Sequence, residues 1–142
     1  HDTLEDTDYT AEELEEDFGR EVRKIVETVT EPKEKAGEKL PWKERKTAYL
    51  EQLKAGPDEA LLVAAADKIH NMRSVVEEYH DNHQGFIKDF AGSLDERAMR
   101  YQELSNLLNR RLQSDIIAEF NHVYSEYKNF LAHVAKSVNK QK

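Results

Sequence analysis

The sequence contains no cysteine. This absence excludes disulfide-stabilised scaffolds, zinc sites with cysteine ligands, and thiol nucleophiles. The chain also lacks any apolar run approaching the roughly 20 residues that a helix needs to span a bilayer, and no signal peptide precedes its first motif. We therefore expect no membrane interaction and a cytoplasmic location.

The balance of charge is negative: 21 Lys and Arg stand against 29 Asp and Glu. The formal net charge is −8 at pH 7, which argues against nucleic acid as a partner, because such binding needs a clustered excess of Lys and Arg. Residues 1–17 contain no Lys or Arg and are rich in Asp and Glu. Most of these acids are typical of a solvated helix face. For Asp2, Glu5, Asp6 and Asp8, which lie close to His1 in sequence, the competing interpretation is a divalent cation that relieves their mutual repulsion.

Local signals predict helices along the whole chain, with no strand-like alternation and no internal repeat. Thr10 and Glu13 match the capping box of a helix start, and Gly19 indicates a break or kink. Residues 31–41 are polar, contain two Pro and one Gly, and predict an exposed loop. Pro41 suits the start of the following helix.

The second half of the chain predicts three long helices. Residues 56–58 (Gly-Pro-Asp) indicate a stop and a restart, with Asp58 as the expected N-cap. Residues 60–66 are apolar on every face, which predicts a central, buried helix over 59–79. In the last helix, apolar residues alternate spacings of four and three: Ile116, Phe120, Val123, Tyr127, Phe130 and Val134. This seam favours an antiparallel hairpin over a coiled-coil homodimer, since short loops join antiparallel neighbours. The predicted fold class is all-α.

The first group of candidate site residues is the segment HDTLEDT at residues 1–7. An imidazole nitrogen and a carboxylate oxygen from His1 and Asp2 suit Mn, Fe or Zn. Glu5 lies four residues after His1 and Asp6 lies four residues after Asp2, so one or two helical turns would bring these groups together. The spacing alone is weakly specific, because acidic helix starts are common.

The second group lies in ADKIHNMRS at residues 66–74. Asp67 directly follows the apolar run of the predicted buried helix, and an unpaired buried carboxylate costs several kcal/mol. It must therefore meet a cation, either a Lys or Arg partner or a metal ion. Asn71, one turn later on the same face, can hydrogen-bond beside it. The acidic cluster at residues 1–7 favours the metal over a structural ion pair.

HDTLEDT followed by ADKIHNMRS resembles the paired signature of the HD hydrolase domain in the RelA/SpoT alarmone enzymes and their small stand-alone relatives. The resemblance runs from His1 to about Ser74 and includes the turn at Phe18-Gly19. After about residue 80 no resemblance continues, and the synthetase segment of the bifunctional enzymes is not recognisable, so a stand-alone hydrolase is the better analogue. The resemblance implies a partial HD-domain helical bundle over 1–80, with the helices of 81–142 packing on the same domain.

The resemblance also implies a reaction: metal-dependent hydrolysis of the 3′-diphosphate ester of ppGpp or a similar nucleotide, with release of pyrophosphate. The implied metal ligands, usually for Mn²⁺ in this family, are His1, Asp2 and Asp67. The acids that position and activate the attacking water are Glu5 and Asp6. The residues near the nucleotide are Asn71 and Ser74.

One part of the family pattern is absent. The family places a further metal-binding His and basic substrate-binding residues upstream of the HD pair, and this sequence begins at that pair. The chain therefore holds three of the four expected protein ligands. We expect a piece of a larger enzyme, with impaired metal affinity and little or no catalysis by the truncated chain itself.

Two alternatives remain open at this point. One is an HD phosphohydrolase that acts on another nucleotide or a phosphomonoester. The other is a non-catalytic helical domain whose C-terminal hairpin binds a partner. Two weaker groups are interpreted structurally: His80, Asp81 and His83 as a solvated helix end, and Arg73 as an ion-pair partner of an acid such as Glu77.

Overall fold

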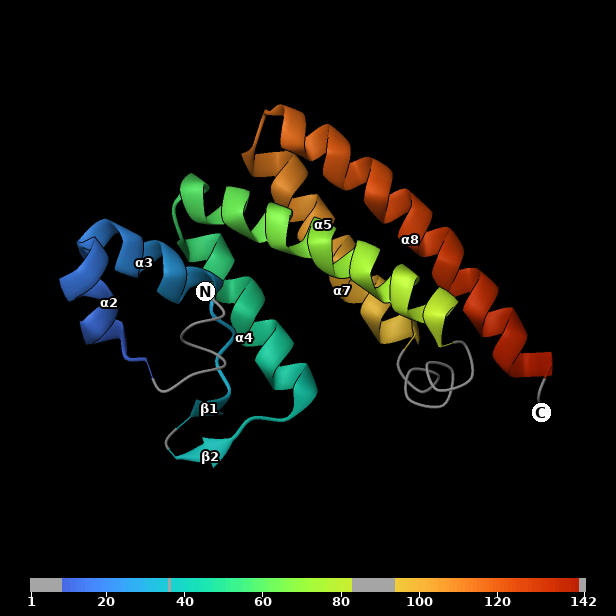
Figure 1. Ribbon diagram of the computed structural model, residues 1–142, viewed down its shortest axis with the longest axis horizontal. Coiled ribbons are helices and arrows are strands. Elements are labelled where there is room, and N and C mark those ends of the chain that lie inside the picture. Colours follow the sequence, from blue (N-terminus) through green and yellow to red (C-terminus); the bar gives the residue numbers. More distant parts are fainter. Residues whose placement is uncertain (1–8, 36, 83–93, 141–142) are drawn as a thin grey trace. The chain divides into compact units, whose positions relative to one another are not determined.

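The computed structural model describes residues 9–35, 37–82 and 94–140 (Figure 1). The described elements, in chain order, are α2 (Ala11–Phe18), α3 (Arg20–Val29), β1 (Glu34–Lys35), β2 (Glu38–Lys39), α4 (Trp42–Ala55), α5 (Asp58–Asp81), α7 (Leu94–Arg111) and α8 (Asp115–Lys140). Helices dominate, which confirms the all-α prediction. In this described part, no helix has both the length and the apolarity needed to cross a membrane.

The chain forms two compact units, residues 1–64 and residues 65–142, and α5 contributes to both. Each unit has its own buried side chains. Those of the first unit are Leu14, Val29, Tyr49, Leu53, Ala60, Leu61 and Ala64. The largest fully buried side chains of the second unit are Met72, Leu107, Leu108, Phe120, Tyr127 and Val134. The predicted division of the sequence at residue 80 stays a prediction.

The start of the first unit follows its sequence signals closely. The backbone N–H of Glu13 donates to Thr10 Oγ1 at 3.1 Å, so Thr10 caps α2 as predicted. Gly19 has a φ of +98°, which is easily reached only without a Cβ. It ends α2 and begins α3, which confirms the predicted break and folds the two helices against each other.

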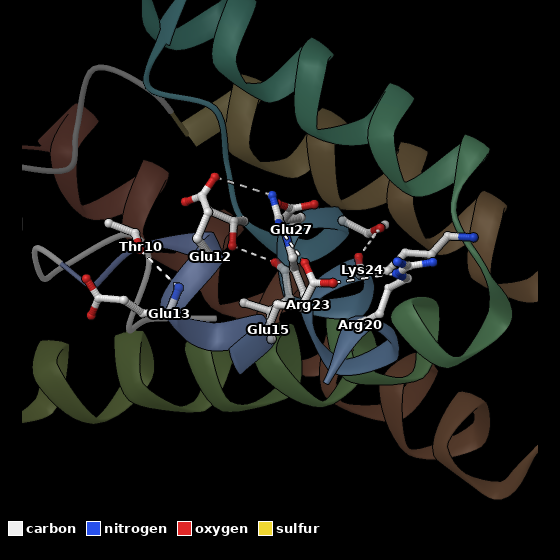
Figure 2. A network of polar contacts seen from close by, with 11 residues as sticks. Thr10, Glu12, Glu13, Glu15, Arg20, Arg23, Lys24 and Glu27 are labelled. Atoms are coloured by element: carbon white, nitrogen blue, oxygen red, sulfur yellow. Dashed lines mark hydrogen bonds and ion pairs between the residues drawn. The ribbon is translucent and has the colours of Figure 1, made fainter. Parts of the chain in front are cut away.

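An ionic network centred on Arg23 joins α2 to α3 (Figure 2). Arg23 Nη1 lies 2.6 Å from Glu15 Oε2, and Arg23 Nε lies 3.0 Å from Glu27 Oε1. Glu12 contacts the same guanidinium at 3.6 Å. The hydrogen bond from Arg23 lowers the pKa of the Glu15 carboxyl. The acidic face of α2 is therefore partly neutralised within the fold, and only partly a solvated surface.

The predicted loop at 31–41 contains a minimal β-hairpin. Glu34 pairs with Lys39 and Lys35 pairs with Glu38 in antiparallel register, and the Glu34–Lys39 pair sets opposite charges across the two strands. Gly37 supplies a positive φ of 82° in the turn. Periodicity could not predict strands of two residues, because two residues do not establish an alternation.

Helix α4 begins directly after Pro41, as predicted, and is held against the end of α3. The Gln52 side chain on α4 donates to the backbone carbonyl of Thr30 at 2.9 Å and to that of Thr28 at 3.3 Å. Lys46 Nζ lies 3.1 Å from Glu31 Oε2. The two bonds from Gln52 satisfy carbonyl groups at the C-terminal end of α3, which lack partners within that helix.

Helix α5 is amphipathic, which corrects the prediction of burial on every face. Its buried positions recur every three or four residues: Ala60, Leu61, Ala64, Ala65, Ile69, Met72 and Tyr79. Leu62 and Val63 face the other way and are 37% and 40% exposed. The error arose because a short apolar run contains residues of both faces, whereas burial follows a single stripe. The carbonyl of Pro57 accepts the first helical bond, so Asp58 is the first helical residue and not the cap.

Helices α7 and α8 of the second unit form the predicted antiparallel hairpin, connected at residues 112–114. The Tyr124 hydroxyl on α8 donates to the carbonyl of Ala98 on α7 at 3.3 Å. Nearer the connection, Asn109 and Asn121 exchange two amide hydrogen bonds of 2.9 Å each. Helix α8 also packs on the C-terminal part of α5, where the rings of Tyr79 and Phe130 meet edge to face at 5.0 Å.

Candidate functional site

Asp67 is the centre of the described part of the candidate site. It lies on α5, three residues after the buried Ala64, and its side chain is 17% exposed. The sequence predicted fuller burial. Because α5 has an exposed face, the carboxylate keeps some contact with solvent and its desolvation is smaller than predicted. Lys68 Nζ lies 3.4 Å from Asp67 Oδ2 and provides the cationic partner that burial requires.

Asn71 lies beside Asp67, as the spacing of four residues predicted. Its Nδ2 donates to Asp67 Oδ2 at 3.5 Å, which is long for a hydrogen bond to a carboxylate. Both contacts therefore approach the same carboxylate oxygen at long range. Such a carboxylate suits a hard cation, because oxygen ligands bind Mn²⁺ and Mg²⁺ well.

Ser74 is not brought to the carboxylate. Its hydroxyl lies 3.4 Å from Nε2 of His70, one turn earlier on α5. Arg73 forms the predicted kind of ion pair but with a different acid: Arg73 Nη2 lies 3.0 Å from Glu119 Oε1 on α8. Helix spacing indicated Glu77 as the partner and could not indicate an acid 46 positions further along, since that contact depends on how α5 packs against α8.

Two residues of α7, Tyr101 and Arg97, were not predicted. Burial raises the pKa of the Tyr101 phenol most, the side chains of Tyr127 and Asp67 raise it further, and the positive charge of Arg97 opposes this rise. Burial also raises the pKa of Tyr127 to about 12, again with Arg97 in opposition. The rings of Tyr101 and Tyr127 lie 5.2 Å apart between their centroids. One signal in the sequence could have pointed to Tyr101. A Tyr at a core-facing position carries a hydroxyl that needs a polar partner.

The other predicted site residues, His1, Asp2, Glu5 and Asp6, lie outside the residues that the structure describes. Within 9–35, 37–82 and 94–140, no group of three or more His, Asp or Glu side chains is arranged to hold a metal ion. His80 and Asp81 are exposed at the end of α5, as expected for a solvated helix end, and His83 is not described.

The fold and the described site define a helical protein that carries a carboxylate–amide pair on a half-buried helix face. Residues 1–92 match the family of HD-domain proteins, and the chain belongs to this family. This confirms the resemblance drawn from the two motifs.

Curated relatives match about half of the chain. The guanosine-3′,5′-bis(diphosphate) 3′-pyrophosphohydrolase MESH1 of Homo sapiens is 45% identical over 75 residues, which cover 53% of this chain and 39% of the relative. A guanosine-3′,5′-bis(diphosphate) 3′-pyrophosphohydrolase of Haemophilus influenzae is 35% identical over 81 residues, 53% of this chain and 11% of the relative. The GTP pyrophosphokinase rsh of Brucella ovis is 37% identical over 81 residues, 53% of this chain and 10% of the relative. The chain thus spans well under half the length of these relatives.

Proposed function

We propose that this chain is part of a metal-dependent phosphohydrolase that releases pyrophosphate from the 3′ position of a guanosine bis(diphosphate) nucleotide. The observation that carries the proposal is the Asp67–Asn71 pair on α5, within an HD-domain match. The printed activities of the human and Haemophilus influenzae relatives support the choice of substrate. The parent protein is the enzyme in this proposal, because the chain covers only part of its relatives.

Asp67 fits a divalent cation: it is a half-buried carboxylate, 17% exposed, whose Oδ2 lies 3.4 Å from Lys68 Nζ and 3.5 Å from Asn71 Nδ2. Together with His1 and Asp2 it would give the nitrogen and oxygen donors that suit Mn²⁺. A bound divalent ion lowers the pKa of coordinated water and polarises the phosphoryl group. Mn²⁺ is the ion we propose.

The chain's own side chains have separate roles in this proposal. Glu5 and Asp6 hold the attacking water and accept its proton, which a carboxylate within hydrogen-bonding reach can do. The 3′ ester bond then breaks, the ribose oxygen takes up a proton, and pyrophosphate leaves. Asn71 orients the Asp67 carboxylate, because its amide donates a hydrogen bond to Oδ2.

The second unit adds features that favour an anionic nucleotide. The positive charge of Arg97 acts on the Tyr101 phenol, and an arginine fork is well suited to phosphate oxygens. Ser74, one turn beyond Asn71 on α5, is the proposed hydroxyl contact to the nucleotide. We also propose that residues 81–142 belong to the same domain as residues 1–80 and that the protein is cytoplasmic. A homodimer formed through the α7–α8 hairpin is the alternative to a monomer.

The test is a substrate panel with the full-length parent protein. Pyrophosphate release is measured from ppGpp and from GTP, and phosphate release from a nucleoside monophosphate, each with Mn²⁺ and with a chelator. Release from ppGpp that requires Mn²⁺ supports the proposal. Phosphate release from the monophosphate alone would favour the alternative HD phosphohydrolase, and no hydrolysis by folded, metal-loaded protein would favour a helical interaction domain.

A further inference from the structure

The half-buried cations of the first unit differ in how their charge is compensated. Arg23 and Lys46 each contact carboxylates, Arg23 at 2.6 Å and 3.0 Å and Lys46 at 3.1 Å. Arg45 is half-buried like them. Its Nε is fully buried, yet no acceptor in the described chain lies within hydrogen-bonding distance of it. Arg45 is thus the exception among these three cations.

An uncompensated guanidinium is costly, because an arginine cannot lose its proton to escape burial. A buried donor without an acceptor loses the hydrogen bond that it made to water in the unfolded chain. An anion that draws the guanidinium toward itself would restore that hydrogen bond and neutralise the charge. The planar fork of arginine matches carboxylate and phosphate oxygens in pairs.

The sequence around Arg45 increases this preference for an anion. Lys43 lies two residues earlier and adds positive charge at the start of α4. Lys46 follows Arg45 directly, but Glu31 Oε2 at 3.1 Å from its Nζ compensates its charge, and the same Nζ lies 5.7 Å from the centre of the Trp42 ring. Trp42 precedes Arg45 by three residues, so the two side chains are neighbours on the helix surface.

We propose that Arg45 is an anion-binding residue that takes a phosphate or diphosphate group. The choice of phosphate over carboxylate rests on the proposed function, whose substrate carries two diphosphates and whose product is pyrophosphate. The same chemistry could come from the intact nucleotide or from the released product, and the experiment separates these two sources.

Trp42 provides a direct readout, because it is the only tryptophan in the chain. Its fluorescence is followed while the metal-free full chain is titrated with inorganic pyrophosphate and, separately, with ppGpp. Four proteins are compared: wild type, Arg45→Gln, Arg45→Lys and Lys46→Gln. Lys46→Gln is the matched control, since it removes an equal charge one residue away that is already paired with Glu31.

We expect saturable binding of pyrophosphate that Arg45→Gln weakens about 10-fold or more, the size expected for losing a charge-assisted hydrogen bond. Arg45→Lys should recover part of the affinity, because it keeps the charge without the fork. Lys46→Gln should change the affinity less than about 3-fold, because Glu31 already compensates the charge of Lys46. Binding of ppGpp but not of pyrophosphate, with the same dependence on Arg45, would assign the residue to the substrate and not to the product.

Three results would overturn the inference. They are equal affinities in wild type and Arg45→Gln, equal losses in Arg45→Gln and Lys46→Gln, and an Arg45→Gln variant that loses stability in urea while binding is unchanged. The last would mean that Arg45 pairs with an acid of the chain. The titration needs neither metal nor turnover, so its result is independent of catalysis. Binding that depends on Arg45, in a protein that does not hydrolyse ppGpp, would support the anion site and contradict the proposed function.

Discussion

Gly56 offers a sharp test of how α3 and α4 pack. Its φ of −88° and ψ of 171° are open to any residue, so the constraint is one of space. A Cβ at this position would overlap with Cγ2 of Thr28 and approach the backbone oxygen of Gln52 to 3.2 Å. Thr28 cannot easily rotate away, because its hydroxyl donates to the Lys24 carbonyl at 2.7 Å. A Gly56→Ala change should therefore force α3 and α4 apart.

The expected magnitude follows from two opposing effects. Overpacking costs about 1–3 kcal/mol, whereas replacing Gly by Ala restricts the unfolded chain and stabilises the fold by about 0.4–1 kcal/mol. The free energy of unfolding should fall by roughly 1–2 kcal/mol. Urea denaturation followed by Trp42 fluorescence measures it, since Trp42 lies on α4 in the same unit.

Thr28→Ser supplies the control, because it removes the methyl group and keeps the hydroxyl. In the Thr28→Ser background, Gly56→Ala should become neutral or slightly stabilising, and the two substitutions should couple by about 1 kcal/mol or more. An equal loss of stability from Gly56→Ala in both backgrounds would refute the steric explanation.

Two further predictions concern polar contacts. Arg23→Gln should lower the melting temperature at pH 7, because Glu15 then loses the hydrogen bond that depresses its pKa below the ordinary 4.5. Since a depressed carboxyl pKa stabilises only above the unfolded-state value, the difference from wild type should shrink as the pH falls below about 4; a pH-independent difference in thermal melts would contradict this. Alanine substitutions at Asn109 and Asn121 should show a coupling of about 0.5–1.5 kcal/mol in a double-mutant cycle, because each amide is the other's partner. Strictly additive losses of stability would mean that the pair does not hold α7 to α8.

Local chemistry determined which parts of the fold could be predicted. Thr10, Gly19 and Pro41 act within one or two turns of the chain, and their effects are as the sequence indicated. The α7–α8 hairpin followed from apolar spacing and a short connection. The burial of α5 did not follow, because Leu62 and Val63 are as apolar as their buried neighbours and only packing selects which face is covered.

The candidate site shows the same division. Asp67 and Asn71 are one turn apart on a single helix, so their spacing was enough to bring them together. The electrostatic interaction between Tyr101 and Asp67 depends on packing between α7 and α5, about 30 positions apart in sequence, and no local pattern encodes it. The same reason explains why Arg73 pairs with Glu119 and not with a residue of its own helix.

The measurement that tests the central claim most directly is Mn²⁺-dependent pyrophosphate release from ppGpp by the full-length parent protein and two variants on α5. Asp67→Asn keeps the shape of the side chain and removes its charge, and Asp81→Asn makes the same change at an exposed position of the same helix. We expect Asp67→Asn to weaken Mn²⁺ binding and to reduce the rate of pyrophosphate release by at least about 100-fold. Losing a residue that only supports a metal ligand reduces activity by about 10–100-fold, so a larger loss indicates a ligand. Asp81→Asn should retain wild-type rates. Equal activity of the two variants, in folded proteins, would contradict the assignment of Asp67 as a metal ligand.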